Sequence, residues 1–396
     1  MDTGEEPPLE GLNVFDASQG VAGPSCAFLL AQYGANVIKV EPPRGDWVRQ
    51  AGTKYGDLAA GYVNFNRGKR ALCINFKTKG GLAIGKRLVS QSDIVIESFR
   101  PGVMGRFGLD YETVKKTNPK VIYCSISGFG TKGPNRDKPV TDVVAQSFTG
   151  WMTLNKGNDG IPHKVGMTAM DVITGLYAYQ AVATALYRRA VKGNGKLIEM
   201  NMMQAAAAFM GQKIIEHVKQ EGKITVLGAP TGTFPTKDGS INLSAREPDK
   251  FHALCQLIEK PELVHDPRFN EWDKRIANVD ELTAIISETT ITKSNAYWTK
   301  ELDKLDIINS PTATFDDFLY HPQTKASDYI NWVNHESLGN IPMATIPGHP
   351  PFTDGTQAHA PHLGEHSKQI LSEYGYGTNE IEGFLKVGSA IQYTEK

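Results

Sequence analysis

The chain has 396 residues, of which 40% are hydrophobic and 21% are charged, and its formal net charge is −1. This length predicts about two domains, and the balanced charge gives no reason to expect a nucleic-acid partner. The acidic start MDTGEEPP lacks the features of a secretory signal or a transit peptide, and no apolar run reaches the roughly 18 residues of a membrane span. We therefore expect a cytoplasmic protein with no membrane partner.

The 4 cysteines stand far apart and form no CxxC pair, which is typical of free thiols in a reducing compartment. The histidines form no HExxH motif and no Cys/His pairs at zinc spacing. The sequence predicts no metal site.

The first part of the chain alternates short apolar strands with helices. Asp110 is placed to cap a helix that runs through Lys116, with Glu112 in its first turn. The other predicted elements are helices at 25–33 and 81–91 and strands at 12–18, 36–41, 71–77, 93–98 and 121–127. This alternation predicts an α/β fold with a doubly wound, mostly parallel sheet.

The pattern of predicted elements changes after about residue 140. Long helical patterns at 140–152 and 171–191 are followed by a strand at 196–202 and a helix through Val218. The stretch GAPTGTF then predicts a loop, and Asp238-Gly239 predicts the turn of a hairpin. Charged helices over 247–325 indicate a second, smaller domain, and the Pro-, Gly- and His-rich tail from Ser337 ends in a final helix at 367–376.

The opening strand-helix-strand unit suggests a nucleotide-like ligand, but its connection reads SQGVAGPSC rather than GxGxxG, which disfavours NAD. Basic residues follow the strands at Arg44, in NRGKR (66–70), at Arg100 and at Arg106. Guanidinium groups match phosphate oxygens, and open α/β sheets bind ligands at their strand ends. The alternative is that these are solvated surface charges.

Asp171 heads an otherwise apolar or small stretch, VGMTAMDVITGLYAY. A carboxylate at a helix start can cap the free backbone N–H groups. It can also be a nucleophile that attacks an activated acyl group, with nearby N–H donors for the oxyanion. The spacing leaves both roles open, and Gly228, Gly232 and Gly239 lie in a loop that could supply such donors.

Many stretches together, in order and spacing, resemble the class III CoA-transferases of the CaiB/BaiF type, which include formyl-CoA and carnitine CoA-transferases. The matching pieces are LEGLNVFDAS, VAGPSCAFLLAQYGANVIKVEPPRGD, NRGKRALCINFKTKGG, SDIVIESFRPGVMGRFGLDYE, NPKVIYCSISGFGTKGP, DVITGLYAYQAVATALYRR, GNGKLIEMNMMQAA, HDPRF, HPQTKA and APHLGEHSKQIL.

The resemblance implies a Rossmann-like large domain with an inserted smaller α+β domain and an interlocked homodimer. The expected parts are a large CoA-binding domain (1–225), a small domain (226–330) and a C-terminal segment that returns to the large domain (331–396). Coenzyme A is then a substrate and product, shared with an acyl-CoA and a small carboxylic acid, and no cofactor is tightly bound.

The resemblance also implies the site. The family's nucleophile corresponds to Asp171, which forms an aspartyl mixed anhydride and then an aspartyl-CoA thioester. CoA-binding positions are expected at Val21, Arg44, Arg70, Leu72, Ser98, Phe99 and Arg106. Residues that line the active site are expected at Gln19, Asp142, Gly228 and Gly232.

Two departures bear on the substrate. Relatives that take formyl or oxalyl groups carry a glycine run where this chain has GAPTGTF, and Gln is common where it has Val21. Both argue against formyl-CoA:oxalate specificity, and succinyl-CoA with a small dicarboxylate is a reasonable pair. An α-methylacyl-CoA racemase of the same fold is disfavoured because 138–150 lacks that enzyme's histidine, and His163 is expected to be a surface residue. A non-catalytic CoA-binding protein remains a further alternative.

Overall fold

The computed structural model describes residues 7–157, 160–222, 226–350, 355 and 357–395. The chain forms two compact units. The first unit combines Met1–Gly211 with Asp328–Lys396, and the second is Gln212–Ser327. Among the described residues, no helix has the length and apolar character needed to cross a membrane.

The first unit is built on a seven-stranded sheet in the order β14-β5-β2-β1-β6-β7-β8. All neighbours are parallel except β14, which runs antiparallel to β5. Without β14, the six parallel strands have the Rossmann order, which reverses between β1 and β6. The predicted α/β, mostly parallel sheet is confirmed, and its strands are β1 (Asn13–Asp16), β2 (Asn36–Glu41), β5 (Arg70–Ile74), β6 (Ile94–Glu97), β7 (Ile122–Ser127), β8 (Lys196–Asn201) and β14 (Ala390–Ile391).

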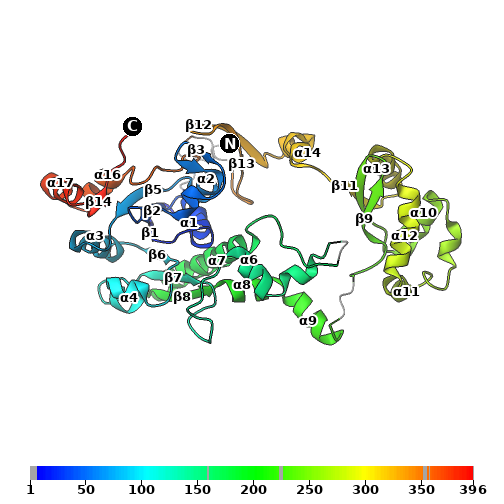
Figure 1. Ribbon diagram of the computed structural model, residues 1–396, viewed down its shortest axis with the longest axis horizontal. Helices are drawn as coiled ribbons and strands as arrows, with labels where there is room; N and C mark the ends of the chain where they lie inside the picture. The colour runs from blue at the N-terminus through cyan, green and yellow to red at the C-terminus, as the bar shows by residue number, and fades with distance from the viewer. Residues whose placement is uncertain (1–6, 158–159, 223–225, 351–354, 356, 396) are drawn as a thin grey trace. The chain divides into compact units, whose positions relative to one another are not determined.

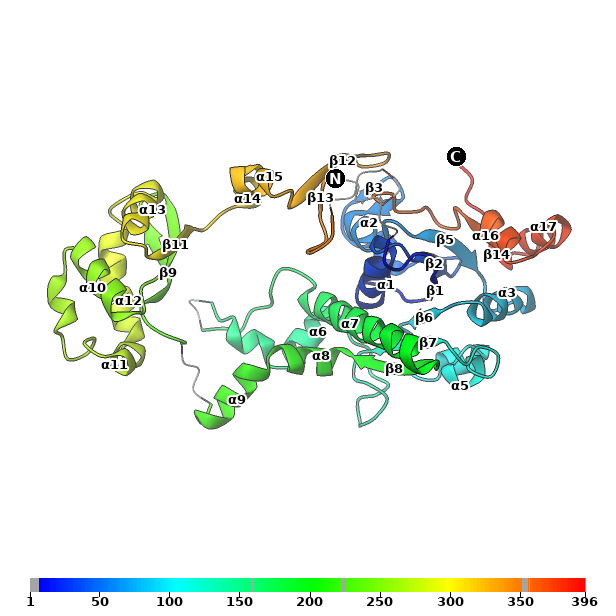
Figure 2. The same cartoon turned by 180° about the vertical axis from the view of Figure 1, so that it is seen from behind.

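Each face of this sheet has its own apolar core, because successive side chains of a strand point to opposite faces. Val14 packs on the side of α1 and α7, whereas Phe15 packs on the side of α3 and α16. Figures 1 and 2 show these two layers on opposite sides of the strands. The helices are α1 (Ala22–Gln32) and α7 (Ala169–Lys192) on one face, and α3 (Lys79–Ser90), α4 (Val103–Phe107), α5 (Tyr111–Val114), α16 (Ser367–Glu373) and α17 (Thr378–Lys386) on the other.

A glycine lets α1 and α7 approach closely. A Cβ on Gly175 would lie 2.5 Å from the Cβ of Ser25 and 2.8 Å from the carbonyl oxygen of Ala22. The absence of a side chain therefore lets the second turn of α7 pack against the first turn of α1.

Some of the predicted helices of this unit begin where the sequence indicates, and others differ in length. Asp110 caps α5 as predicted and accepts a hydrogen bond from the backbone N–H of Thr113 at 3.1 Å. The predicted helix at 140–152 is shorter, and it divides into α6 (Asp142–Phe148) and a 3-10 helix (Trp151–Leu154). The helix predicted through Val218 likewise divides into α8 (Met202–Phe209), in this unit, and α9 (Gly211–Lys219), which belongs to the second unit except for Gly211.

The C-terminal segment contains more structure than we expect from its sequence. A hairpin of β12 (Ile330–His335) and β13 (Gly339–Ala344) shares an apolar cluster with α2 (Ala60–Asn66). The same cluster includes Val48 of a 3-10 helix (Trp47–Gln50) and Leu58 of β4 (Leu58–Ala59), the strand that pairs with β3 (Lys54–Tyr55). The prediction that 367–376 is the final helix is wrong. Gly375 has a φ of 81° and interrupts the helix, and α17 and β14 follow it.

The second unit has a three-stranded antiparallel sheet in the order β11-β10-β9 and a core around Phe234, Phe251 and Trp298. The predicted hairpin at Asp238-Gly239 is confirmed, since Gly239 pairs with Thr236. The elements are β9 (Thr231–Thr236), β10 (Gly239–Ser244), α10 (Pro248–Leu257), a 3-10 helix (Pro261–Val264), α11 (Trp272–Ala277), α12 (Val279–Thr290), α13 (Asn295–Lys304), β11 (Ile308–Pro311), α14 (Phe315–Tyr320) and α15 (Pro322–Ala326).

Candidate active site

A cavity of about 650 Å³ opens at the carboxyl ends of the strands in the first unit. Its walls come from the segments that follow β1, β2, β6 and β7 and from the first turns of α6 and α7. The strand order reverses between β1 and β6, so the cavity occupies the position where open α/β sheets bind ligands.

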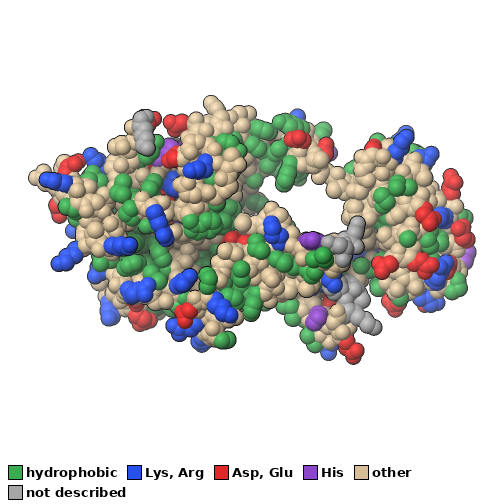
Figure 3. Space-filling model, viewed as in Figure 1, with side chains coloured by type: hydrophobic (Ala, Val, Ile, Leu, Met, Phe, Trp, Pro, Cys, Tyr) green, Lys and Arg blue, Asp and Glu red, His purple; other side chains and the backbone are tan. Residues whose placement is uncertain are grey.

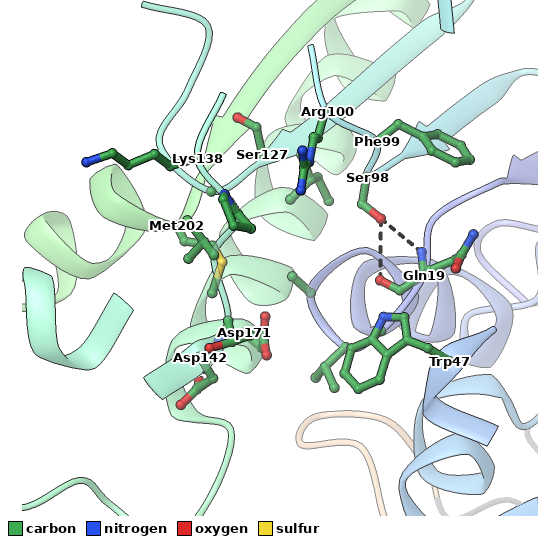
Figure 4. Close-up of a pocket in the computed structure, with 18 of the residues that line it drawn as sticks. Gln19, Trp47, Ser98, Phe99, Arg100, Ser127, Lys138, Asp142, Asp171 and Met202 are labelled. Carbon is green, nitrogen blue, oxygen red and sulfur yellow. Dashed lines mark hydrogen bonds between the residues drawn. The ribbon is translucent and has the colours of Figure 1, made fainter. Parts of the chain in front are cut away.

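Asp171 lies in the first turn of α7, and its side chain faces this cavity (Figure 4). Burial raises the pKa of Asp171 to about 7, and the nearby charge of Asp142 adds to the increase. Among the described residues, none donates a hydrogen bond to the Asp171 carboxylate. The group is therefore a poorly solvated carboxylate that is free to meet a ligand.

Asp142 supplies the cap that α7 needs. Its Oδ2 accepts hydrogen bonds from the backbone N–H groups of Met170, at 2.7 Å, and Asp171, at 3.1 Å. The N-cap residue Thr168 makes no side-chain capping bond. Asp171 therefore does not cap its own helix, and the capping alternative for this residue is wrong. The cap comes from α6 and leaves the Asp171 carboxylate unused.

The opposite wall of the cavity is held by Ser98. The backbone N–H of Gln19 donates to Ser98 Oγ at 2.9 Å, and this hydroxyl donates to the carbonyl oxygen of Gln19 at 3.3 Å (Figure 4). The preceding Glu97 accepts the backbone N–H of Phe99 at 2.8 Å, and burial raises the pKa of Glu97 to about 7. These bonds tie the loop after β1 to the loop after β6.

A buried ion pair stabilises the loop after β1, which belongs to the same wall. Lys39 Nζ lies 2.7 Å from Asp46 Oδ2, and both side chains are fully buried. Lys39 also donates to the carbonyl oxygen of Ser18 at 2.6 Å, while Asp46 accepts the N–H of Gly20 at 3.0 Å. A Cβ on Gly20 would lie 2.8 Å from Trp47, so the loop and this indole are in close contact. The network fixes the loop that carries Gln19 and Gly20.

The cavity also carries positive charge, from Arg44, Arg100, Arg136 and Lys138. Arg100 extends toward the middle of the cavity, whereas Lys138 extends away from the two carboxylates (Figure 4). Arg136 is paired with Asp137 at 3.3 Å. Such a set suits a ligand with several anionic groups.

The structure brings together seven of the sequence-predicted site residues. The cavity is lined by Gln19, Val21, Arg44, Ser98, Phe99, Asp142 and Asp171. Three others do not line it. Leu72 is fully buried in the core, Arg70 is paired with Glu373 at 2.8 Å, and Arg106 is exposed on α4, where Figure 3 shows Lys and Arg side chains gathered. A role for these three residues in CoA binding stays a prediction.

Gly228 and Gly232 belong to the second unit, and their predicted role at the site also stays a prediction. The lining residues that sequence reasoning missed include Trp47, Arg136, Lys138 and Met202. For Trp47, the signal was its position directly after the PPRGD stretch at a strand end. For Arg136 and Lys138, it was their nearness to Asp142.

Within the part of the chain that the structure describes, no group of three or more His, Cys, Asp or Glu side chains could hold a metal ion. All 4 cysteines are buried and free. What the cavity offers chemically is one poorly solvated carboxylate, a second carboxylate that caps its helix, and several cations.

Comparison with known proteins places the chain in a family. A model described as CoA-transferase family III matches residues 9–367. The chain is 30% identical over 402 residues to succinyl-CoA:glutarate CoA-transferase of Mus musculus, and the match covers 98% of this chain and 92% of the relative. It is 34% identical over 331 residues to acetyl-CoA:oxalate CoA-transferase of Acetobacter aceti, with coverage of 82% and 85%.

A solved structure also matches the fold of this chain. The crystal structure of a CaiB/BaiF family protein from Brucella suis matches with a TM-score of 0.81 and 32% identity, and the match covers 93% of this chain and 100% of that chain. The family model spans most of the sequence, and the fold agrees with that of a solved member. The chain therefore belongs to family III of the CoA-transferases.

Proposed function

We propose that the protein transfers CoA from an acyl-CoA, with succinyl-CoA as the first candidate, to a small carboxylic acid through covalent intermediates on Asp171. One observation carries the proposal. The Asp171 carboxylate faces the cavity without a hydrogen-bond donor among the described residues, while Asp142 caps the helix in its place. A carboxylate that burial has deprived of solvent is a stronger nucleophile than a solvated one.

The reaction then proceeds in four balanced steps. An oxygen of Asp171 attacks the thioester carbonyl carbon, the C–S bond breaks, and CoA leaves as a thiolate from an aspartyl mixed anhydride. The thiolate attacks the aspartyl carbonyl carbon and releases the donor acid as its carboxylate, which leaves an aspartyl-CoA thioester. The acceptor carboxylate attacks this thioester and forms a second anhydride and CoA thiolate. The thiolate takes the acceptor acyl group and regenerates the Asp171 carboxylate.

Each step develops negative charge on a carbonyl oxygen, which needs donors nearby. The first turn of α1 begins on the cavity wall, where its N-cap Val21 makes no side-chain capping bond. The first N–H groups of a helix have no partner within the helix, so those of α1 are candidates for this role. Arg44 and Arg100 line the cavity, and we assign them to pair with the phosphate groups of CoA or with a second carboxylate of the acid.

The identity of the acids is suggested by relatives. Similar proteins are named for succinyl-CoA, glutarate and oxalate, and each name applies to that relative. The cations of the cavity suit dicarboxylic acids as acceptors. We further propose an interlocked homodimer, on the basis of the family resemblance, and light scattering of the purified chain would test it.

A racemase of the same fold is the second candidate. Proton exchange next to a thioester needs an acid/base pair, for which those relatives use a histidine. Among the described residues that line the cavity, none is a histidine. This observation favours transfer over racemisation.

The test is incubation of the pure protein with succinyl-CoA and a panel of oxygen-18-labelled acids, including glutarate, oxalate and mesaconate. We expect a new acyl-CoA in the mass spectrum and labelled oxygen in the peptide that contains Asp171, because the bridging oxygen of the second anhydride stays on the enzyme. A single turnover leaves one labelled oxygen there, and repeated turnover can label both oxygens of the carboxylate. Full activity of Asp171→Asn, or transfer without any label on that peptide, would refute the mechanism. Deuterium exchange into a 2-methylacyl-CoA without transfer would support the racemase.

A further inference from the structure

A fully buried glutamine stands directly behind Asp142. Gln146 lies one turn further along α6, and its side chain is 0% exposed. Its Nε2 donates to Asp142 Oδ1 at 2.5 Å and to the carbonyl oxygen of Met167 at 3.3 Å. Its Oε1 accepts the backbone N–H of Val165 at 2.9 Å. Both ends of the amide are engaged, and the donors and acceptors around it fix which end is which.

These contacts join α6 to the segment that leads into α7. Val165 and Met167 come shortly before α7 begins at Ala169. Asp142 holds the first N–H groups of the same helix. Gln146 and Asp142 together therefore secure both the approach to α7 and its first turn.

The bonds also fix the position of the Asp142 carboxylate. One oxygen accepts from Gln146, and the other accepts two backbone N–H groups. Three hydrogen bonds to its two oxygens leave this carboxylate little freedom to rotate. The result is a fixed negative charge next to Asp171, which lies beside Asp142 in Figure 4.

We infer that Gln146 is a positioning residue for CoA transfer: it anchors Asp142 in the orientation in which that carboxylate caps α7 and faces Asp171. The inference rests on the proposed role of Asp171. Gln146 itself does not line the cavity, so it acts through Asp142 and touches no substrate. The charged groups that line the cavity with Asp171 are Asp142, Arg44, Arg100, Arg136 and Lys138.

The test is Gln146→Leu, which removes the donor and the acceptor at similar volume. With succinyl-CoA and the best acid of the panel above, we expect kcat to fall about tenfold or more, because small displacements of a reacting group are costly. The KM for succinyl-CoA should stay near that of the wild type, because the cations are untouched. The midpoint of the pH–rate profile should move to lower pH, because Asp142 is no longer held against Asp171.

The matched control is Gln32→Leu. Gln32 is also a buried glutamine, on α1, and its Nε2 donates to the carbonyl oxygen of Gln357 at 3.3 Å without lining the cavity. We expect this variant to lose stability while it keeps the wild-type pH midpoint. If Gln146→Leu behaves in the same way, Gln146 is only structural and the inference is overturned.

Two further measurements keep the test decisive. If Gln146→Leu does not fold, Gln146→Glu keeps the acceptor for Val165 but places a second carboxylate against Asp142, so the pair should share a proton and add an ionisation to the pH profile. An unchanged profile would overturn the inference.

The pKa of Asp171 can also be measured without any activity. The free energy of unfolding is measured across pH for a chain with Asp171 and for its Asp171→Asn variant, and the pH dependence of the difference gives the pKa of Asp171. The pair is compared once with Gln146 present and once in the Gln146→Leu background. We expect the pH at which this difference changes to be lower in the second background, and an identical pH in both would overturn the inference. This measurement tests Gln146 even if Asp171→Asn retains transfer and the proposed function fails.

Discussion

Asp142 caps the helix on which Asp171 stands: its Oδ2 accepts the backbone N–H of Asp171 at 3.1 Å while its charge helps to raise the pKa of the Asp171 carboxyl. The Asp142 carboxylate thus accepts hydrogen bonds from the backbone of α7, and the Asp171 carboxylate faces the cavity. Two acidic groups at one helix end are divided between a structural and a reactive task.

The rate of the first half-reaction should depend on the ionisation of Asp171. Its pKa is raised to about 7, and only the carboxylate form attacks a thioester. We expect kcat/KM for succinyl-CoA to be level above this pH and to fall about tenfold per pH unit below it. Initial rates of formation of the new acyl-CoA, at low succinyl-CoA and saturating acceptor acid, would measure the profile across pH. A profile that stays level down to about pH 5 would contradict the assignment.

Asp171→Asn should stabilise the fold, and more so at higher pH. The folded pKa lies above the ordinary value of 3.8, so the folded state binds the proton more tightly, and stability is lost as the pH rises through about 7. Asparagine does not ionise, so the variant does not lose stability as the pH rises through this range. After allowance for solvent screening, we expect its advantage in the free energy of unfolding to grow by about 2 kcal/mol between about pH 5 and about pH 8. Urea denaturation at each pH would show a constant difference if the raised pKa is wrong.

Lys39→Met should damage both stability and the site. Asp46 would be left as a buried charge without its partner, which typically costs about 3–5 kcal/mol. Adding Asp46→Asn should recover part of this loss, because the unpaired charge is removed. A double-mutant cycle in urea would test the coupling, and strictly additive losses would argue against it.

Gly175→Ala and Gly383→Ala should change stability in opposite directions. Each glycine lies in a helix, but a Cβ on Gly175 would meet Ser25 and Ala22, whereas a Cβ on Gly383 would meet nothing within 4 Å. We expect Gly175→Ala to lose about 1–3 kcal/mol by overpacking. Gly383→Ala should gain about 0.5–1 kcal/mol from helix propensity. Thermal unfolding of both variants would check the pair, and a stabilised Gly175→Ala would contradict the close packing of α1 and α7.

The parallel sheet could be predicted because its strands are short and rich in Val and Ile, such as NVIKVE and DIVIES, and are largely buried on both faces. The hairpin of β12 and β13 could not, because INWVNH and GNIPMA mix polar and apolar side chains and bury only part of their length. In the site, Asp171 could be identified as a candidate from its apolar setting and the family resemblance. That Asp142 would cap its helix could not, because the bond spans 28 positions of the sequence and depends on how α6 docks.

The first unit is made from both ends of the chain, and this has a consequence for its synthesis on the ribosome. The layer that covers Leu72 and Ile84 includes Ile370 and Ile381, and β14 completes the sheet beside β5. A nascent chain therefore exposes this apolar face until the whole of Gln212–Ser327 has been translated. At about 5–20 residues per second, that interval lasts for many seconds, during which a chaperone has an accessible surface to bind.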